Sequence, residues 1–281
     1  MTKAGFLVSL TAALALVLGG CGSESGGQWS VDVTGSFGAP VSVQITGKPH
    51  LQGMRATTLS AGEGVTIQES SPVLFRATSF DSRTGNQVNE YDTGRVRLQH
   101  ATTDELGDLA QYVIGQKEGS RLLIERGGLV QGDNNTVEIV VIDLFYTNAR
   151  GNPVPTPEPP PAGMPGINTA EDAGPVITSG GGPISKLAIV PLVAGTGTQV
   201  GEDDAVIAQY VLANTEGEIL DSTWAGPGPQ TLHVQEVMTG LRTAIQDQKI
   251  GSRIAVLIPE EQAHGEGDLV AIVDLLAIRE P

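Results

Sequence analysis

The sequence predicts an α+β protein built from two copies of one small, mostly β domain that carries a short helix. A repeat within the chain supports this prediction, because QKEGSR at 116–121 returns as QKIGSR at 248–253. Two further matches keep the same order, and the offset falls from 133 to 132 to 131 residues along the chain. Such matches indicate a duplicated domain with short insertions or deletions in its loops. The further matches are LSAGEG (59–64) with LVAGTG (192–197), and VVIDL (140–144) with AIVDL (271–275).

The first 20 residues, MTKAGFLVSLTAALALVLGG, have one basic residue, Lys3, followed by an apolar run over 4–18. A membrane-spanning helix needs about 20 apolar residues, whereas this run has the length of the apolar region of a signal peptide. We therefore expect residues 1–20 to be an export signal that is absent from the mature protein.

Cys21 is the one cysteine of the chain, and LGGC at 18–21 resembles the lipobox of bacterial lipoproteins. The alternative is an ordinary signal peptide followed by an incidental cysteine. The resemblance implies a diacylglycerol on the Cys21 sulfur, and each buried methylene then adds ~0.8 kcal/mol of membrane affinity. We expect a lipid-anchored protein on the extracytoplasmic face of a bacterial cell membrane, with residues 21–45 as anchor and lead-in segment. With one cysteine no internal disulfide can form, so packed cores must supply stability.

The net charge of −16 argues against nucleic acid as a partner, since an acidic surface repels phosphate backbones. We attribute the acidic excess to solubility, because it is spread along the chain. The four histidines are scattered without metal-ligand spacing, and GTG at 195–197 lacks the strand–turn–helix context of a nucleotide site. We therefore expect no metal and no other cofactor.

A domain boundary is indicated by residues 148–183, which begin NARGNPVPTPEPPPAGMPG and end TSGGGP. Proline fixes an extended backbone and glycine loosens it, and the segment has little apolar surface to bury. We expect a linker there, semi-rigid in its proline half, between a first domain at 46–147 and a second domain at 184–281.

Apolar, β-branched runs bounded by turn residues predict the strands of the second copy. The helix is predicted at 239–249, where Leu241 and Ile245 are four residues apart, and Gly251 is interpreted as its stop signal. The predicted strands are AVIAQYVLA (205–213), SRIAVLIP (252–259) and DLVAIVDLLAI (268–278).

These stretches in this order resemble the FKBP-type peptidyl-prolyl cis-trans isomerases, over about 185–279 well and over about 46–147 more weakly. VDVTGSFGAPVSVQ at 31–44 is also similar to the lead-in of exported bacterial members. The resemblance implies that each domain is an antiparallel sheet wrapped on one short helix. The stretches that carry it are VAGTG (193–197), QY (209–210), EGEILDST (216–223), VMTGL (237–241), QKIGSR (248–253), IPEEQAHG (258–265) and LVAIVDLL (269–276).

The resemblance implies an activity, isomerisation of X-Pro bonds, that needs no catalytic triad. Rotation about the amide meets a barrier of ~18–20 kcal/mol, and an apolar pocket that removes water from the twisted amide lowers it. The residues implied as catalytic are Tyr210, Asp221, Met238 (through its backbone N–H) and His264. The residues implied as substrate-binding are Leu220, Val237, Leu241 and Ala271.

Four of these positions depart from the family, because Leu220, Leu241, His264 and Ala271 replace aromatic residues. Aromatic rings contribute large flat area to the binding of a proline ring. We therefore expect weaker binding of substrates and macrolides than in a typical member. In the first copy Ala77 stands at the tyrosine position, Asn89 at the aspartate position and Arg126 within the IPEE counterpart, which predicts a domain that has lost catalysis.

Three functions remain open from the sequence. The first is an isomerase that assists the folding of exported, proline-containing polypeptides, and the second is a non-catalytic binding module or holdase. The missing aromatic residues favour the holdase, whereas Tyr210 and Asp221 favour the enzyme. A purely structural lipoprotein would have no affinity for proline peptides.

Overall fold

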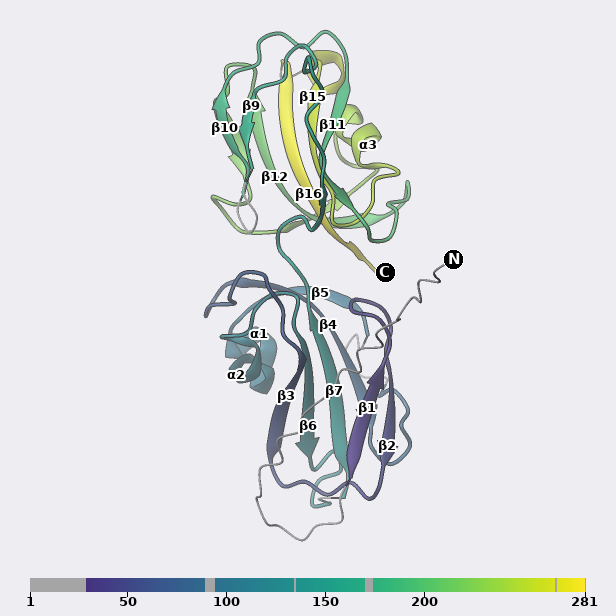
Figure 1. Ribbon diagram of the computed structural model, residues 1–281. Helices are drawn as coiled ribbons and strands as arrows, with labels where there is room; N and C mark the ends of the chain where they lie inside the picture. Colours follow the sequence, from purple (N-terminus) through teal and green to yellow (C-terminus); the bar gives the residue numbers. More distant parts are fainter. Residues whose placement is uncertain (1–28, 89–93, 134, 170–173, 266, 281) are drawn as a thin grey trace, which may run out of the picture.

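The computed structural model describes residues 29–88, 94–133, 135–169, 174–265 and 267–280. The predicted signal peptide and Cys21 lie outside the described residues. The described part contains two large antiparallel sheets of similar design, one in each half of the chain, and two two-stranded sheets (Figure 1).

The first sheet has the strand order β3-β6-β7-β4-β5. A short helical segment covers one of its faces, and Gly107, with φ +56°, interrupts this segment after its first turn. The side chain of Thr102 accepts a hydrogen bond from the Glu105 amide and so caps the segment. The elements are β3 (Met54–Ser60), β4 (Pro72–Asp81), β5 (Val96–His100), α1 (Thr103–Leu106), η1 (Gly107–Leu109), α2 (Ala110–Val113), β6 (Arg121–Gly127) and β7 (Val137–Leu144).

The second sheet has the order β13-β12-β16-β15-β11-β8, and β14 also pairs with β12. Its helix, α3 (Thr239–Ile245), is shorter than predicted, because Gln246 is extended and Asp247 has φ +64°. Gly251 is not the stop signal of the helix; it lies in the turn before β15, where a Cβ would meet the Arg150 carbonyl at 2.3 Å. The strands are β8 (Gly151–Pro153), β11 (Ala188–Gly195), β12 (Ala205–Asn214), β13 (Ile219–Ser222), β14 (Gln230–His233), β15 (Arg253–Ile258) and β16 (Leu269–Arg279), and η2 (Glu260–Gln262) precedes β16.

The strand registers place the two copies in one-to-one correspondence. Ala77 lies opposite Ile142 in the first sheet, and Tyr210 lies opposite Val273 in the second. These positions keep the offsets of 133 and 131 residues found in the sequence repeat. The α+β fold predicted from the repeat, with two similar antiparallel sheets that each carry a short helix, is therefore confirmed.

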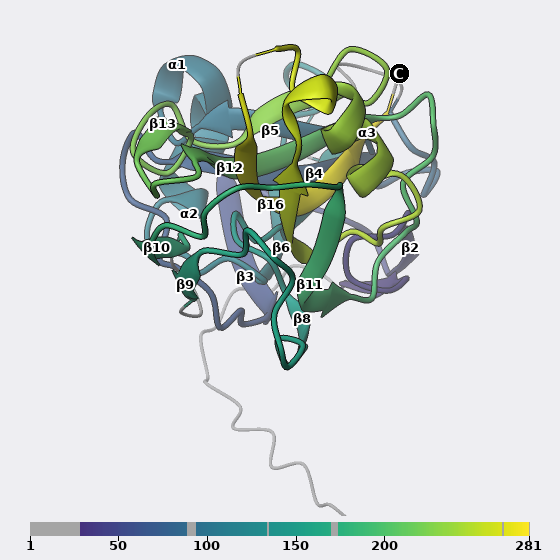
Figure 2. The same ribbon diagram turned by 90° about the horizontal axis from the view of Figure 1, so that it is seen from above.

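A β-hairpin covers the face of each sheet that is turned away from the helix. In the first domain β1 (Ser30–Thr34) and β2 (Ser42–Thr46) pack on the layer around Ile139 and Val141. In the second domain β9 (Gly166–Asn168) and β10 (Val176–Ser179) pack on Ala255 and Ile272. Figures 1 and 2 show α3 and this second hairpin on opposite sides of the sheet.

The proline- and glycine-rich segment therefore differs from the linker that its composition predicted. Within it, β8 pairs with β11, and Met164 packs against the buried side chains of Ile184 and Leu257. The few apolar side chains of the segment pack on the face of the second sheet that is turned away from α3. The lead-in segment before residue 46 has the same role for the first sheet.

Each sheet also buries an arginine–aspartate ion pair on the hairpin face. Arg253 Nε donates to Asp274 Oδ1 at 2.6 Å, and the Ala149 amide donates to Asp274 Oδ2 at 2.7 Å. In the first domain Arg121 Nε donates to Asp143 Oδ1 at 2.6 Å, and the Gly38 amide donates to Asp143 Oδ2 at 2.7 Å. Each pair thus joins two central strands of its sheet to a segment that comes earlier in the chain. This segment contains Gly38 for the first sheet and Ala149 for the second.

The two domains contact each other through a small apolar cluster and several polar bonds. The cluster joins Leu74 and Val96 of the first sheet to Ile207 and Leu276 of the second. Arg76 Nη2 donates to Glu280 Oε1 at 2.7 Å, so the end of β16 is held against the first domain. Figure 1 shows this end of the chain reaching toward the first domain.

Asp274→Ala is expected to lower the free energy of unfolding by about 3–5 kcal/mol, because Arg253 would keep a buried charge without its partner. Urea unfolding followed by tryptophan fluorescence measures the change. Asp81→Ala is the matched control, since it removes one partner of the exposed ion pair with Arg83 and is expected to cost far less. A loss below about 1 kcal/mol for Asp274→Ala would contradict the structural role of the pair.

Candidate active site

A tyrosine–aspartate pair lies on the helix side of the second sheet. Tyr210 is on β12, and its hydroxyl donates to Asp221 Oδ2 on the edge strand β13 at 2.8 Å. Thr223 fixes the backbone of the tyrosine, since its Oγ1 accepts from the Tyr210 amide at 2.9 Å and its own amide donates to Tyr210 O at 3.0 Å. The two side chains predicted for the pocket edge are therefore in contact.

The environment of Tyr210 keeps its hydroxyl protonated. Burial, and then the hydrogen bond to Asp221, raise the pKa of Tyr210 to about 12 from its usual 10.0. A neutral hydroxyl remains a hydrogen-bond donor throughout the physiological range. The Tyr210 hydroxyl can therefore position an amide by donating a hydrogen bond, but it does not supply a phenolate nucleophile.

An apolar cluster lies beneath the pair. Tyr210, Val237 and Met238 pack at its edge, whereas Leu241 and Ala271 are buried within it. Ala271 lies opposite Leu212 on the neighbouring strand, and Leu212 also packs on the cluster. The structure thus brings together six of the eight residues that the sequence assigned to the site. Asp221 lies at the rim, and the other five are in or against the cluster.

Met238 is the N-cap residue that immediately precedes α3, with φ −54° and ψ 147°. Its carbonyl accepts from the Arg242 amide, which starts the helix. Within the described part of the chain its own N–H donates to no acceptor. This is the group that the family resemblance assigns to the substrate carbonyl.

Leu220 and His264 are placed differently from the rest of the site. Leu220 is on β13 next to Asp221, but its side chain is 54% exposed and lies outside the apolar cluster. His264 is exposed in the loop after η2, where it has φ +56°. Among the described residues, the His264 side chain makes no hydrogen bond to Tyr210 or Asp221.

Three further residues of this cluster were not predicted from the sequence: Leu212, Leu232 and Ile258. The alternation of side chains along a strand could have found Leu212, because it lies two residues from Tyr210 and shares its face. Leu232 and Ile258 depend on pairings between distant strands, which a single sequence does not specify.

The first domain has a polar network at the corresponding place. Arg126 lies opposite Glu138 across β6 and β7, at the positions that Ile258 and Leu269 occupy in the second sheet. Arg126 Nε donates to Glu138 Oε2 at 2.7 Å, and Ser79 Oγ donates to Glu138 Oε1 at 2.5 Å. Arg126 therefore has a partner, and three polar residues replace apolar ones.

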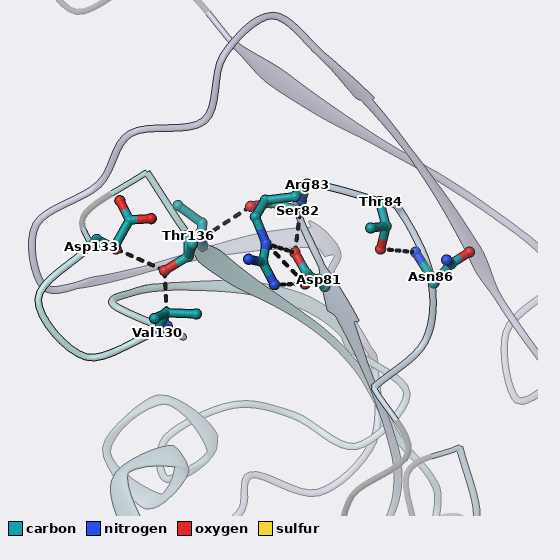
Figure 3. Close-up of polar contacts among 9 residues, drawn as sticks. Asp81, Ser82, Arg83, Thr84, Asn86, Val130, Asp133 and Thr136 are labelled. Atoms are coloured by element: carbon teal, nitrogen blue, oxygen red, sulfur yellow. Dashed lines mark hydrogen bonds and ion pairs between the residues drawn. The ribbon is translucent and has the colours of Figure 1, made fainter.

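In the first domain, the loop that corresponds to the His264 loop is held by hydrogen bonds between its own residues (Figure 3). The Thr136 hydroxyl donates to the Asp133 carbonyl at 2.7 Å and accepts from the Val130 amide at 2.9 Å. Ala77, the counterpart of Tyr210, is buried and has no hydroxyl. Asn89, the proposed counterpart of Asp221, lies outside the described residues.

No group of three or more His, Cys, Asp or Glu side chains that could hold a metal ion occurs in the described ranges. A helix long and apolar enough to cross a membrane is also absent from them.

An antiparallel sheet folded on a short helix, with a Tyr–Asp pair at the rim of an apolar cluster, defines the class of FKBP-like domains. Residues 197–273 match the sequence model of this family, described as FKBP-type peptidyl-prolyl cis-trans isomerase. Residues 197–273 of the second domain are therefore similar to the FKBP family.

One curated relative is "Outer membrane protein MIP" of Legionella longbeachae, which is 35% identical over 72 residues. The match covers 26% of this chain and 31% of the relative, so the chain matches about a third of that protein.

Solved structures with similar parts include FkpA from Escherichia coli (24% identity, TM-score 0.32, 33% of this chain and 48% of that one). A peptidyl-prolyl cis-trans isomerase from Pseudomonas syringae has 25% identity and a TM-score of 0.31. The match covers 34% of this chain and 76% of the isomerase chain. The three FKBP domains of wheat FKBP73 have 15% identity and a TM-score of 0.32, and cover 82% of this chain and 96% of their own.

The raised pKa of Tyr210 makes the stability of the protein pH-dependent at alkaline pH. Because the folded state holds this proton more tightly than the unfolded state, stability falls as the pH rises from about 10 to about 12. Tyr210→Phe is expected to flatten the pH profile in this window. Asp221→Asn is expected to lower the pKa of Tyr210 while leaving it above 10, since burial is the larger cause. Ultraviolet titration of the phenolate measures both, and a normal Tyr210 pKa in the unchanged protein would refute the described contact.

Proposed function

We propose that the second domain catalyses cis/trans isomerisation of X-Pro bonds in exported polypeptides. The observation that carries the proposal is the Tyr210–Asp221 hydrogen bond at the edge of an apolar cluster. The family of the domain supports it, since its members are peptidyl-prolyl isomerases by description.

The mechanism requires an apolar surface and a few donors. The proline ring would rest on Val237, Met238 and Leu241, away from water. Loss of water disfavours the planar, charge-separated amide, so the twisted amide becomes less costly. The Met238 N–H would hold the substrate carbonyl, and Tyr210, oriented by Asp221, would stand at the pocket edge. His264 would hydrogen-bond a substrate carbonyl from its loop.

A binding module or holdase is the second candidate, favoured by the aliphatic character of the site. Leu241 and Ala271 replace aromatic residues in the cluster, and Leu220 is exposed rather than packed. Such a site would still hold proline-containing segments, and macrolides weakly, but would stabilise the twisted amide less. Substrate turnover distinguishes the two candidates.

The first domain is proposed to have an accessory role in holding or spacing. The Arg126–Glu138–Ser79 network occupies the place where a proline ring would need apolar contacts. Binding a proline ring there would break charged hydrogen bonds, which is unfavourable without replacement partners. We therefore assign turnover to the second domain alone, and this domain includes the packed segment 148–183 in addition to 184–281.

Attachment to a bacterial membrane through a lipid on Cys21 belongs to the same proposal. It is supported by LGGC at 18–21 and by the apolar run before it. The relative from Legionella longbeachae is itself named an outer membrane protein. The protein would then meet its clients, which are unfolded exported polypeptides, on the extracytoplasmic face.

The test is the isomerisation rate of a cis-enriched X-Pro peptide with residues 22–281. We expect acceleration above the uncatalysed rate, and Asp221→Ala should lower kcat/KM about tenfold, because the tyrosine loses the acceptor that orients it. Tyr210→Phe combined with Asp221→Ala should remove most of the acceleration.

Ser79→Ala, a change in the first domain, is the matched control and should leave the rate unchanged. Acceleration that survives the double variant would contradict the assignment to the second domain. Binding of the peptide without any acceleration would favour the holdase.

A further inference from the structure

A cavity of about 630 Å³ lies at the junction of the two domains, away from the Tyr210–Asp221 site. Small-molecule sites have volumes of about 300–1,000 Å³, so its size is that of a ligand pocket. Its walls are largely apolar and come from both domains. They include Phe37, Phe145 and Tyr146 from the first half of the chain, and Ile250, Leu276 and Ile278 from the second.

Aromatic rings form the first-domain wall. Phe37 stands in the turn between β1 and β2, and its ring meets that of Phe145 edge to face, with centroids 5.7 Å apart. Phe37 is nevertheless 40% exposed. An exposed phenylalanine at the rim of an apolar cavity is a suitable contact for an alkyl chain.

A buried arginine supplies the polar end of the cavity. Arg76 lies on β4, is 8% exposed, and donates from Nη2 to Glu280 Oε1. Its Nε has no acceptor among the described residues. Because a buried donor without an acceptor is unfavourable, this N–H favours a ligand that brings an acceptor.

Two arginines line the cavity. Its charged lining residues are Arg76, Arg150 and Glu280, and Glu280 is already bonded to Arg76. Arg150 also stacks over the Tyr146 ring at 4.4 Å, which places its guanidinium beside the aromatic wall. The Arg76 Nε–H, on the guanidinium that also binds Glu280, can donate one charge-assisted hydrogen bond to a carboxylate.

We propose that this cavity binds an amphipathic carboxylate, with the carboxylate on Arg76 and the alkyl chain along Phe37 and Phe145. The ligand would contact both domains at once. It would therefore fix the first domain relative to the isomerase domain. The proposal does not depend on isomerase activity.

The test is calorimetric titration of residues 22–281 with decanoate, using decanol and acetate as probes that lack the charge or the chain. We expect saturable binding of one decanoate, with decanol and acetate at least about tenfold weaker, as loss of a charged hydrogen bond or of apolar burial implies. Arg76→Met should weaken decanoate binding about tenfold and leave decanol unaffected. Arg83→Met is the matched control, because that arginine pairs with Asp81 (Figure 3), the last residue of β4, and does not line the cavity.

Circular dichroism establishes whether each variant is folded. Should Arg76→Met fail to fold, Phe37→Ser tests the same site from an exposed position and should weaken decanoate binding severalfold, through lost apolar burial. Three results would overturn the proposal: no saturable binding of decanoate, equal binding of decanol, or decanoate binding that the folded variants leave unchanged.

Discussion

An arginine–aspartate pair buried on the hairpin face of each sheet is the interaction on which the rest of the structure depends. The Arg253–Asp274 pair joins the two central strands of the second sheet, and Asp274 also accepts from the Ala149 amide. In the first sheet, Asp143 of the Arg121–Asp143 pair accepts from the Gly38 amide. A charge in this position is tolerated only when its partner and its hydrogen bonds are in place. The pair therefore requires the hairpin or junction segment to be seated, and the sheet becomes an inner layer between helix and hairpin.

The strand β12 shows how this constraint reaches the site. Gln209 points to the hairpin face, is 4% exposed and donates to the Thr147 carbonyl at the domain junction. Tyr210, the next residue, points to the opposite face and meets Asp221. Because successive residues of a strand face opposite sides, fixing the junction also fixes the tyrosine. The first domain has the same scaffold, but with Ala77 and a charged network at the site, so the shared fold does not imply a shared activity.

The duplicated fold could be predicted from the sequence, because repeat words and apolar runs report local pattern and order. The Tyr210–Asp221 contact also followed, but from family resemblance and not from spacing. The packing of 148–183 could not be predicted, since a proline-rich composition does not show that Met164 buries against a sheet over distant strands. The early end of α3 at Ile245 was missed because it depends on the backbone of Asp247, which pairs with Val200.

The central claim is that one of two similar domains keeps a working proline pocket. Nuclear magnetic resonance of the methyl groups, titrated with an Ala-Leu-Pro-Phe peptide, tests it most directly. The account predicts shifts at Val237, Met238 and Leu241, and none at Ala77 or Val140 of the first domain. Shifts confined to the first domain, or equal shifts in both, would contradict it.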